Sequence, residues 1–375
     1  MDFDFSADEK ALLKQLGVAL GELSTGRDLE GGDPRENLDA AFDALGGVQP
    51  YPGLCLEATT PSGTSALLAA VELVASTSPS LCLALESSLR VYGRAIADLG
   101  NDEQKEWWLD RVIEGAHVGA LALSEATMNV VNDPLTTRGE REGNTFRVSG
   151  HKGFVVNAPV ADVFAVAGLV DDAEALFMMK RDTPGLTVGE RLTTSGFRGA
   201  AIASVTLDGC EVHSDDVLFI GDGGSLLSLL RRAEDLALIG IGLGLMKRSI
   251  DAAKKHARAH KTGGRPIVKY QEVSFKLAEV LTLYQTSQLL AYRAAWTMDS
   301  GSDEAGALVD CAKVFCAESA EQVASAALQI LSTAGIVSPN PVEEAFRCAK
   351  VLQIAGTSSE IARVQVGDDT LARWG

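Results

Sequence analysis

The sequence predicts an α+β protein that is mainly helical, with helices on both sides of a central β domain. Apolar residues recur at helical spacing in the N-terminal region, change to short β-type runs at Gly119, and return to helical spacing from Ser225 onward. The chain has 375 residues, of which 46% are hydrophobic, and this is enough apolar material for two or three domains. The predicted order is therefore helices, strands, helices.

The N-terminal region opens with a helix start signal. Ser6 and Glu9 have the spacing of a capping box, in which each side chain bonds the other residue's backbone N–H. Proline and glycine clusters then interrupt the helical pattern. The pattern resumes in three predicted helices: 64–75, 81–99 and 101–113. We place an N-terminal helical domain at residues 1–118.

The middle region carries short runs rich in β-branched and aromatic residues, separated by Gly, Asp and Pro. Six such runs are predicted strands: 120–124, 146–149, 153–156, 163–167, 175–179 and 202–207. Six strands within about a hundred residues indicate a compact β domain. We place this middle domain at residues 119–222.

The C-terminal region contains long amphipathic segments joined by short connections. Four helices are predicted: 226–258, 270–298, 302–335 and 342–355. Long helices that follow one another with short joints form antiparallel bundles. We therefore predict a C-terminal four-helix bundle domain at residues 223–375.

Charge and hydropathy exclude several classes of partner. The chain has 33 Lys and Arg against 51 Asp and Glu, for a net charge of −18, and it has no basic patch with interleaved aromatics. Such a surface repels phosphate backbones, so we expect no nucleic acid partner. No apolar stretch reaches the roughly 20 residues that span a membrane, so we expect no membrane partner either. The acidic N-terminus lacks the basic and apolar regions of a signal peptide.

The six cysteines are scattered, and none lies in a CxxC pair or near clustered histidines. We therefore expect neither a disulfide framework nor a metal site. A reduced, cytoplasmic compartment fits this usage best.

Several motifs follow one another along the chain: Leu121-Ala-Leu-Ser-Glu125, Val148-Ser-Gly-His-Lys152 with Phe154-Val-Val-Asn157, Pro184-Gly-Leu186, Gly264-Arg-Pro-Ile267 with Gln271, and Gly356-Thr-Ser358 followed by Glu360-Ile361 and Arg363. Each motif alone is weak. Together, in this order and over nearly the whole chain, they resemble the motifs of the acyl-CoA dehydrogenase family.

The resemblance implies a three-domain fold that holds FAD between the β domain and the C-terminal helices, usually in a tetramer. It also implies α,β-dehydrogenation of an acyl thioester, in which a glutamate removes the α-proton while the β-hydride passes to flavin N5. An α C–H is a very weak acid, so such a base must be desolvated and held within reach of the α-carbon. The flavin carries the redox chemistry, and the protein aligns it.

The resemblance assigns Glu234 as the catalytic base. Many relatives place the base just before the tail motif, where this chain has Ala355. A minority, resembling isovaleryl-CoA and long-chain dehydrogenases, carry it on the first long C-terminal helix, where this chain has Glu234. The alternative is a solvated ion pair with Arg231, three residues earlier. The apolar face around Glu234 favours catalysis, because a carboxylate there is costly without a role. Asp235 replaces the usual arginine and adds negative charge next to the base.

Ten positions match cofactor-binding positions of the family: Leu123, Ser124, Phe154, Val156, Gln271, Ser332, Thr333, Gly335, Thr357 and Ser358. Several have changed residue type. Val156 replaces a threonine, and Ser332-Thr333 replaces a glycine pair that contacts the pyrophosphate. The loop 126–133 has lost its Pro, Gly and Ser. FAD binding is still predicted, with a weakened site.

Three functions are compatible with this pattern. The first is an FAD-dependent dehydrogenase of an acyl thioester carried by CoA or an acyl carrier protein, with an electron-transfer flavoprotein or oxygen as acceptor. The second is a weakly or non-flavinylated subunit of a heteromeric α2β2 enzyme, non-catalytic or half-catalytic by itself, because the ADP contacts have drifted. The third is a repurposed biosynthetic member acting on a carrier-bound acyl group. By resemblance, the chain is a homo-tetramer or dimer in the first case and pairs with a sister subunit in the second.

Overall fold

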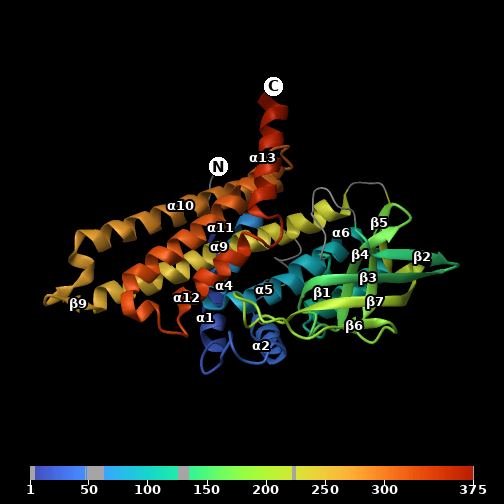
Figure 1. Cartoon of the computed structure of the whole chain (residues 1–375), viewed down its shortest axis with the longest axis horizontal. Coiled ribbons are helices and arrows are strands. Elements are labelled where there is room, and N and C mark those ends of the chain that lie inside the picture. The colour runs from blue at the N-terminus through green and yellow to red at the C-terminus, as the bar shows by residue number, and fades with distance from the viewer. Residues whose placement is uncertain (1–4, 47, 49–62, 126–134, 222–224, 375) are drawn as a thin grey trace.

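A computed structural model of the chain describes residues 5–46, 48, 63–125, 135–221 and 225–374. Figure 1 shows long C-terminal helices at one end of an elongated molecule and the sheet at the other. The shorter N-terminal helices lie beside the bundle, and α5 and α6 extend from it toward the sheet. The predicted order of helices, strands and helices is confirmed.

The N-terminal helices within the described residues are α1 (Ala7–Leu23), α2 (Pro34–Gly46), α4 (Gly63–Thr77), α5 (Pro79–Glu86), α6 (Gly93–Leu99), α7 (Asp102–Trp108) and α8 (Asp110–Ile113). The predicted capping box is present: the Ser6 hydroxyl accepts from the Glu9 backbone N–H, and the Glu9 carboxylate accepts from the Ser6 N–H. The single helix predicted over 81–99 is divided, because a π-helix (η1, Ser87–Tyr92) separates α5 from α6. Of the predicted proline and glycine interruptions, residues 50–53 and 61–62 lie outside the described residues, and Gly63 begins α4.

The middle region forms one sheet, in the order β6-β7-β3-β2-β4-β5-β8, with β1 pairing in parallel with β4. Its strands are β1 (Gly119–Ala122), β2 (Arg138–Glu142), β3 (Thr145–Val156), β4 (Val163–Val170), β5 (Ala173–Lys180), β6 (Leu186–Val188), β7 (Ile202–His213) and β8 (Val217–Ile220). All six predicted runs lie at least partly in strands. Two of them, 146–149 and 153–156, are one continuous strand, β3, whose register against β7 shifts at two irregularities.

The C-terminal helices are α9 (Leu226–Ala259), α10 (Gln271–Asp299), α11 (Ala305–Leu331), α12 (Pro341–Leu352) and α13 (Ser359–Trp374). A short hairpin of β9 (Lys261–Thr262) and β10 (Arg265–Pro266) joins α9 to α10. The helix predicted over 302–335 ends earlier, because Ser332 adopts a left-handed backbone with φ of 53° and a 3-10 turn follows. The last helix, α13, was not predicted.

One large core joins the N-terminal and C-terminal helices. Helix α9 packs closely on α4 through two glycines: a Cβ on Gly240 would lie 2.6 Å from Val71 Cγ1, and a Cβ on Gly244 would lie 2.5 Å from the Ala75 Cβ. A second core fills the other face of the sheet. None of the described helices has the length and hydropathy needed to cross a membrane.

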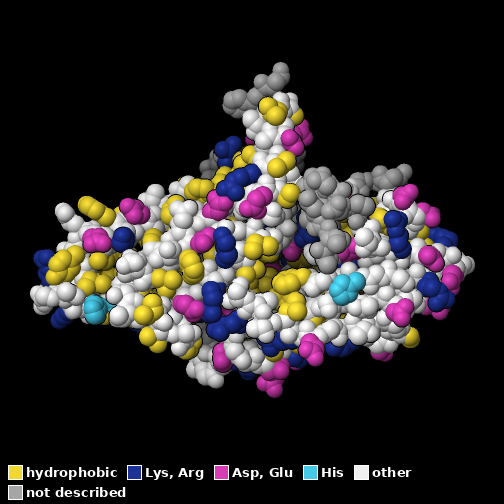
Figure 2. All heavy atoms as spheres, viewed as in Figure 1, with side chains coloured by type: hydrophobic (Ala, Val, Ile, Leu, Met, Phe, Trp, Pro, Cys, Tyr) yellow, Lys and Arg dark blue, Asp and Glu magenta, His cyan; other side chains and the backbone are white. Residues whose placement is uncertain are grey.

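Large apolar side chains are exposed on the surface of the C-terminal region, where Figure 2 shows hydrophobic groups scattered between charges. They include Phe275, Leu281, Leu289 and Trp296 on α10, and Ile354, Val364 and Leu371 near the C-terminus. Single exposed apolar side chains are normal on a protein surface, whereas contiguous ones mark surfaces that contact other chains.

Candidate active site

A cavity of about 450 Å³ lies where the N-terminal helices, the sheet and helix α9 meet. This volume falls in the range of small-molecule sites, roughly 300–1,000 Å³. The loop before α13 closes another side through Ala355 and Gly356. Four parts of the chain that are distant in sequence therefore form one site.

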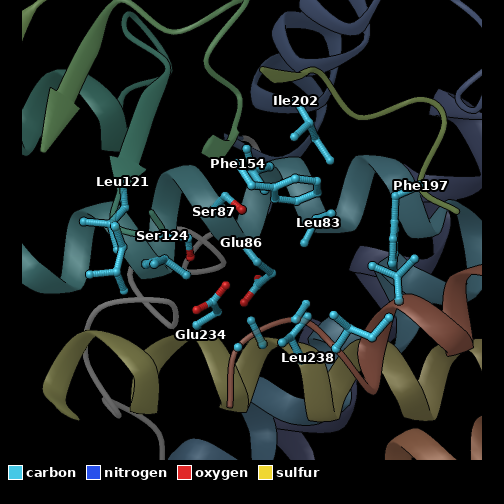
Figure 3. Close-up of a pocket in the computed structure, with 18 of the residues that line it drawn as sticks. Leu83, Glu86, Ser87, Leu121, Ser124, Phe154, Phe197, Ile202, Glu234 and Leu238 are labelled. Atoms are coloured by element: carbon cyan, nitrogen blue, oxygen red, sulfur yellow. The ribbon is translucent and has the colours of Figure 1, made fainter. Parts of the chain in front are cut away.

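The sheet wall of the cavity consists of residues at the end of β1 and along β3: Leu121, Leu123, Ser124, Phe154 and Val156. Figure 3 shows the Leu121, Ser124 and Phe154 side chains at this wall. Phe154 is 43% exposed although it lines a concave surface. An aromatic ring in this position offers an apolar face to a bound planar group. The structure thus brings together four predicted cofactor residues: Leu123, Ser124, Phe154 and Val156.

Glu234 lies on the opposite wall, on α9, with its side chain 29% exposed. Its Oε2 is 2.6 Å from Nη1 of Arg231, so the predicted alternative of an ion pair is also present. Arg231 in turn donates from Nη2 to the Ser124 hydroxyl oxygen at 3.1 Å. The ion pair is not solvated as the alternative required, because Arg231 is only 9% exposed and lines the same cavity.

Asp235 does not line the cavity, but the expected negative charge beside the base is present, because, in addition to burial, a like-charge interaction with Glu234 helps to raise the pKa of Asp235. Its two carboxylate oxygens accept from the Thr357 backbone N–H at 2.8 Å and the Thr357 hydroxyl at 2.6 Å. Burial raises the pKa of Asp235 to about 6, although Lys313 and the Thr357 hydrogen bonds act in the other direction. Asp235 therefore fastens the loop before α13 to α9.

Two predicted cofactor residues, Thr357 and Ser358, lie next to the cavity without lining it. Thr357 is buried and its donors are used by Asp235. The Ser358 hydroxyl accepts from the Ile361 backbone N–H at 3.4 Å, at the start of α13. Their observed role is to position the loop whose Ala355 and Gly356 reach the cavity.

The other four predicted cofactor residues lie away from this cavity: Gln271, Ser332, Thr333 and Gly335. Gln271 begins α10, and the other three form the 3-10 turn after α11. Both segments lie at the end of the bundle near β9, far from the sheet (Figure 1). They are held near each other by a small core that includes Val273, Leu277 and Leu331.

A buried ion pair fixes the loop that carries Leu123 and Ser124. Lys152 Nζ lies 2.6 Å from Glu125 Oε1 and donates to the Leu123 carbonyl oxygen at 3.2 Å. Although burial opposes it, hydrogen bonds from Lys152 and Thr136 hold the pKa of Glu125 at about 2, and burial lowers the pKa of Lys152 to about 8. The motif residues Glu125 and Lys152 thus shape the sheet wall. The predicted loop 126–133 lies outside the described residues.

Sequence reasoning missed Glu86 and Ser87, which line the cavity from the end of α5 and the start of the π-helix. A signal was present: Glu86 and Arg90 are charged residues at helical spacing within an otherwise apolar run. Among the described residues, no group of three or more His, Cys, Asp or Glu side chains could hold a metal ion.

Comparison with known proteins identifies the origin of this architecture. Residues 120–210 match the acyl-CoA dehydrogenase middle domain, and residues 233–371 match the acyl-CoA dehydrogenase C-terminal domain. The chain belongs to the acyl-CoA dehydrogenase family. It is 30% identical to a 3-(aryl)acrylate reductase of Clostridium sporogenes over 76% of this chain and 78% of that protein. It is also 30% identical to the mitochondrial isovaleryl-CoA dehydrogenase of Oryza sativa subsp. japonica over 72% and 67%.

Among solved structures, the fold is similar to that of butyryl-CoA dehydrogenase from Megasphaera elsdenii, with a TM-score of 0.90 and 23% identity over 99% of this chain and 100% of that one. Members of the family are oxidoreductases that act on CH–CH donors of acyl thioesters with FAD, and this chain is an enzyme of that class.

The residues present fit the ring end of an FAD molecule. The sheet wall presents the exposed Phe154 face, and the cavity volume suits a ligand of this class. Arg231, which lines the cavity, has a buried Nε without a hydrogen-bond partner in the described parts of the chain, so this side chain is not fully satisfied by the protein alone. Leu123, Ser124, Phe154 and Val156 are the residues that would hold the ring.

Proposed function

We propose that Glu234 is the base that removes the α-proton of an acyl thioester in this cavity, within a chain organised as domains 1–118, 119–222 and 223–375. The observation that carries the proposal is the position of the Glu234 carboxylate, which faces the sheet wall across the cavity. No other carboxylate of α9 lines the cavity in the described residues, since Asp235 is bonded to Thr357.

The protein's own groups prepare the site for this step. The Arg231 guanidinium donates one hydrogen bond to the Glu234 carboxylate and another to the Ser124 hydroxyl. The carboxylate therefore has a fixed position before substrate binds. Leu83, Ala237 and Leu238 give the cavity an apolar lining that excludes water and strengthens electrostatic interactions. FAD, when bound, would provide the acceptor for the hydride that leaves the β-carbon.

Glu234→Gln tests the assignment. The amide has the shape of the carboxylate but cannot accept a proton, so we expect turnover to fall by about 10²–10⁴-fold with the flavin spectrum retained. The assay uses phosphopantetheine thioesters and an artificial electron acceptor. Glu343→Gln is the matched control, because Glu343 pairs with Arg347 on α12 and does not line the cavity. Wild-type turnover in Glu234→Gln would remove Glu234 as the base.

We propose further that each FAD is completed by a second chain. Gln271, Ser332, Thr333 and Gly335 lie at the far end of the bundle, so they are placed to serve a cofactor bound by a neighbouring subunit. The exposed apolar side chains of α10 support such an assembly. The assembly is a homo-dimer or homo-tetramer, or an α2β2 heteromer with a sister subunit.

The flavin content of the chain expressed alone separates these assemblies. A homo-oligomer is yellow, with flavin near one per chain. A heteromer gives substoichiometric flavin alone and full flavin after co-expression with a sister chain. A colourless, folded protein under both conditions would contradict FAD binding and favour a repurposed, non-oxidative function on a carrier-bound acyl group.

For the remaining assignments, we propose a cytoplasmic enzyme of lipid metabolism. The thioester carrier is CoA or an acyl carrier protein, and the electron acceptor is an electron-transfer flavoprotein or oxygen. Comparing the turnover of one acyl group on CoA and on an acyl carrier protein identifies the thioester carrier. Oxygen consumption without an added acceptor identifies oxygen as the electron acceptor.

A further inference from the structure

A second carboxylate, Glu86, faces the cavity from the wall opposite α9. Glu86 is the last residue of α5, is fully buried, and lines the cavity beside Leu83 and Ser87. Figure 3 shows the Glu86 and Glu234 carboxylates approaching each other from the two walls. Glu86 is paired within its own wall: its Oε2 lies 2.8 Å from Nε of Arg90, whose side chain is 3% exposed.

Stability alone does not account for a charged pair at this position. The cost of removing two charges from water commonly exceeds their attraction, and well-packed apolar residues often replace such a pair without loss. The three guanidinium nitrogens of Arg90 are buried and have no well-aligned hydrogen bond within the described residues, so this guanidinium is incompletely satisfied. A binding role explains why it is retained.

The backbone beside Glu86 supports the same conclusion. Residues Ser87–Tyr92 form a π-helix, a rare conformation that is frequently found at functional sites. This segment places Ser87 and Val91 on the cavity wall together with Glu86. An apolar acyl chain needs neither this conformation nor a buried carboxylate.

We propose that Glu86 binds a hydrogen-bond-donating substituent, a hydroxyl or a protonated amino group, on the acyl part of the substrate. The enzyme therefore selects polar acyl thioesters over plain hydrocarbon ones. An ionised carboxylate only accepts hydrogen bonds, and bonds to a charged group are about twice as strong as neutral ones. This inference rests on the proposed function, because the acyl group must occupy the same cavity as Glu234.

The test compares thioesters of phosphopantetheine, the arm that CoA and acyl carrier proteins share. C4 is the first acyl carbon that α,β-dehydrogenation leaves unchanged, so the panel carries a hydroxyl or an amino group at the end of butyryl and pentanoyl chains. Pentanoyl and hexanoyl thioesters are the controls with the same number of heavy atoms. In the holoenzyme we expect kcat/KM for one polar series to exceed its apolar control by about 10-fold or more. Which series is preferred identifies the donor as hydroxyl or amine.

The decisive variant is Glu86→Leu/Arg90→Leu, which removes both charges and leaves neither partner stranded. We expect it to lower the ratio of polar to apolar kcat/KM by about 100-fold. Glu86→Gln is the second variant, for the case in which the double variant fails to fold. It keeps the side-chain shape but loses the charge-assisted hydrogen bond, so the ratio of polar to apolar kcat/KM also falls below that of the wild type. Glu343→Gln also removes a carboxylate charge, but on α12 and outside the cavity, so its ratio stays that of the wild type.

Calorimetric binding of the same thioesters separates this inference from the proposed function. Binding that prefers the polar series and depends on Glu86, in an enzyme that dehydrogenates none of them, supports the Glu86 assignment and overturns the dehydrogenation. Dehydrogenation that favours the apolar series, with a ratio unchanged in the double variant, overturns the Glu86 assignment alone. Absence of binding by every thioester overturns both.

Discussion

Two adjacent carboxylates on α9 belong to different regions of the molecule. Glu234 lies in the cavity, partly exposed and paired with Arg231. Asp235 lies in the junction with the loop before α13, almost fully buried and bonded to Thr357. Consecutive residues on a helix point about 100° apart, so one segment can supply a reactive group to one region and a structural group to the next. Neighbouring acids in the sequence therefore need not share one site.

The largest expected effect on stability is at Asp235. Asp235→Ala leaves the buried Thr357 N–H and hydroxyl without their acceptors, and we expect the free energy of unfolding to fall by about 2–4 kcal/mol. Urea denaturation measures this change. Glu234→Gln is the comparison, because a partly exposed ion pair contributes about 0–1 kcal/mol. Equal losses in the two variants would contradict the division between the regions.

The pH dependence of stability sharpens the comparison. The folded pKa of Asp235 is about 6, above the ordinary value of 3.8, so the folded protein holds this proton more tightly than the unfolded chain. The contribution is complete below about pH 3.8 and is lost as the pH rises to about 6. Over this window, the wild type should lose about 3 kcal/mol relative to Asp235→Asn. Parallel denaturation profiles of the two proteins would contradict the assignment.

A smaller effect tests how α9 is held. Gly240→Ala places a Cβ 2.6 Å from Val71 Cγ1, and we expect a loss of about 1–3 kcal/mol from overpacking. In Gly242→Ala the nearest atoms are 3.5 Å from the new Cβ, an ordinary contact, so its stability should be unchanged or slightly raised. Thermal unfolding of the two variants, measured side by side, checks the expectation. Similar melting temperatures would show that α4 and α9 can separate.

Most of the fold was predictable because its signals are local. The capping box at Ser6, the change of period at Gly119 and the long bundle helices all appear where the pattern predicts them. The π-helix after Glu86 and the positive φ of Ser332 were not predicted, because both depend on packing rather than on residue type. Strand β2 was missed because only one of its five residues is buried, which leaves no alternating pattern to detect.

The site was predictable in part. The motif resemblance located Ser124, Phe154 and Glu234, which meet in one cavity. The direction of Asp235 was not predictable, since its partner Thr357 is more than a hundred residues away in the chain. Glu86 was missed because its charge stands in a run that periodicity assigns to the core.

The close glycine contact between α4 and α9 sets the position of α9, and therefore of its cavity-lining residues, relative to the N-terminal helices. Gly240 and Gly244 fix how far α9 can slide or turn against its neighbour, and Glu234 stands on the same rigid helix. One residue inserted between Glu234 and Gly240 would rotate the carboxylate by about 100° around the helix axis. Among natural homologues, insertions and deletions should accordingly avoid this interval, even where individual side chains vary.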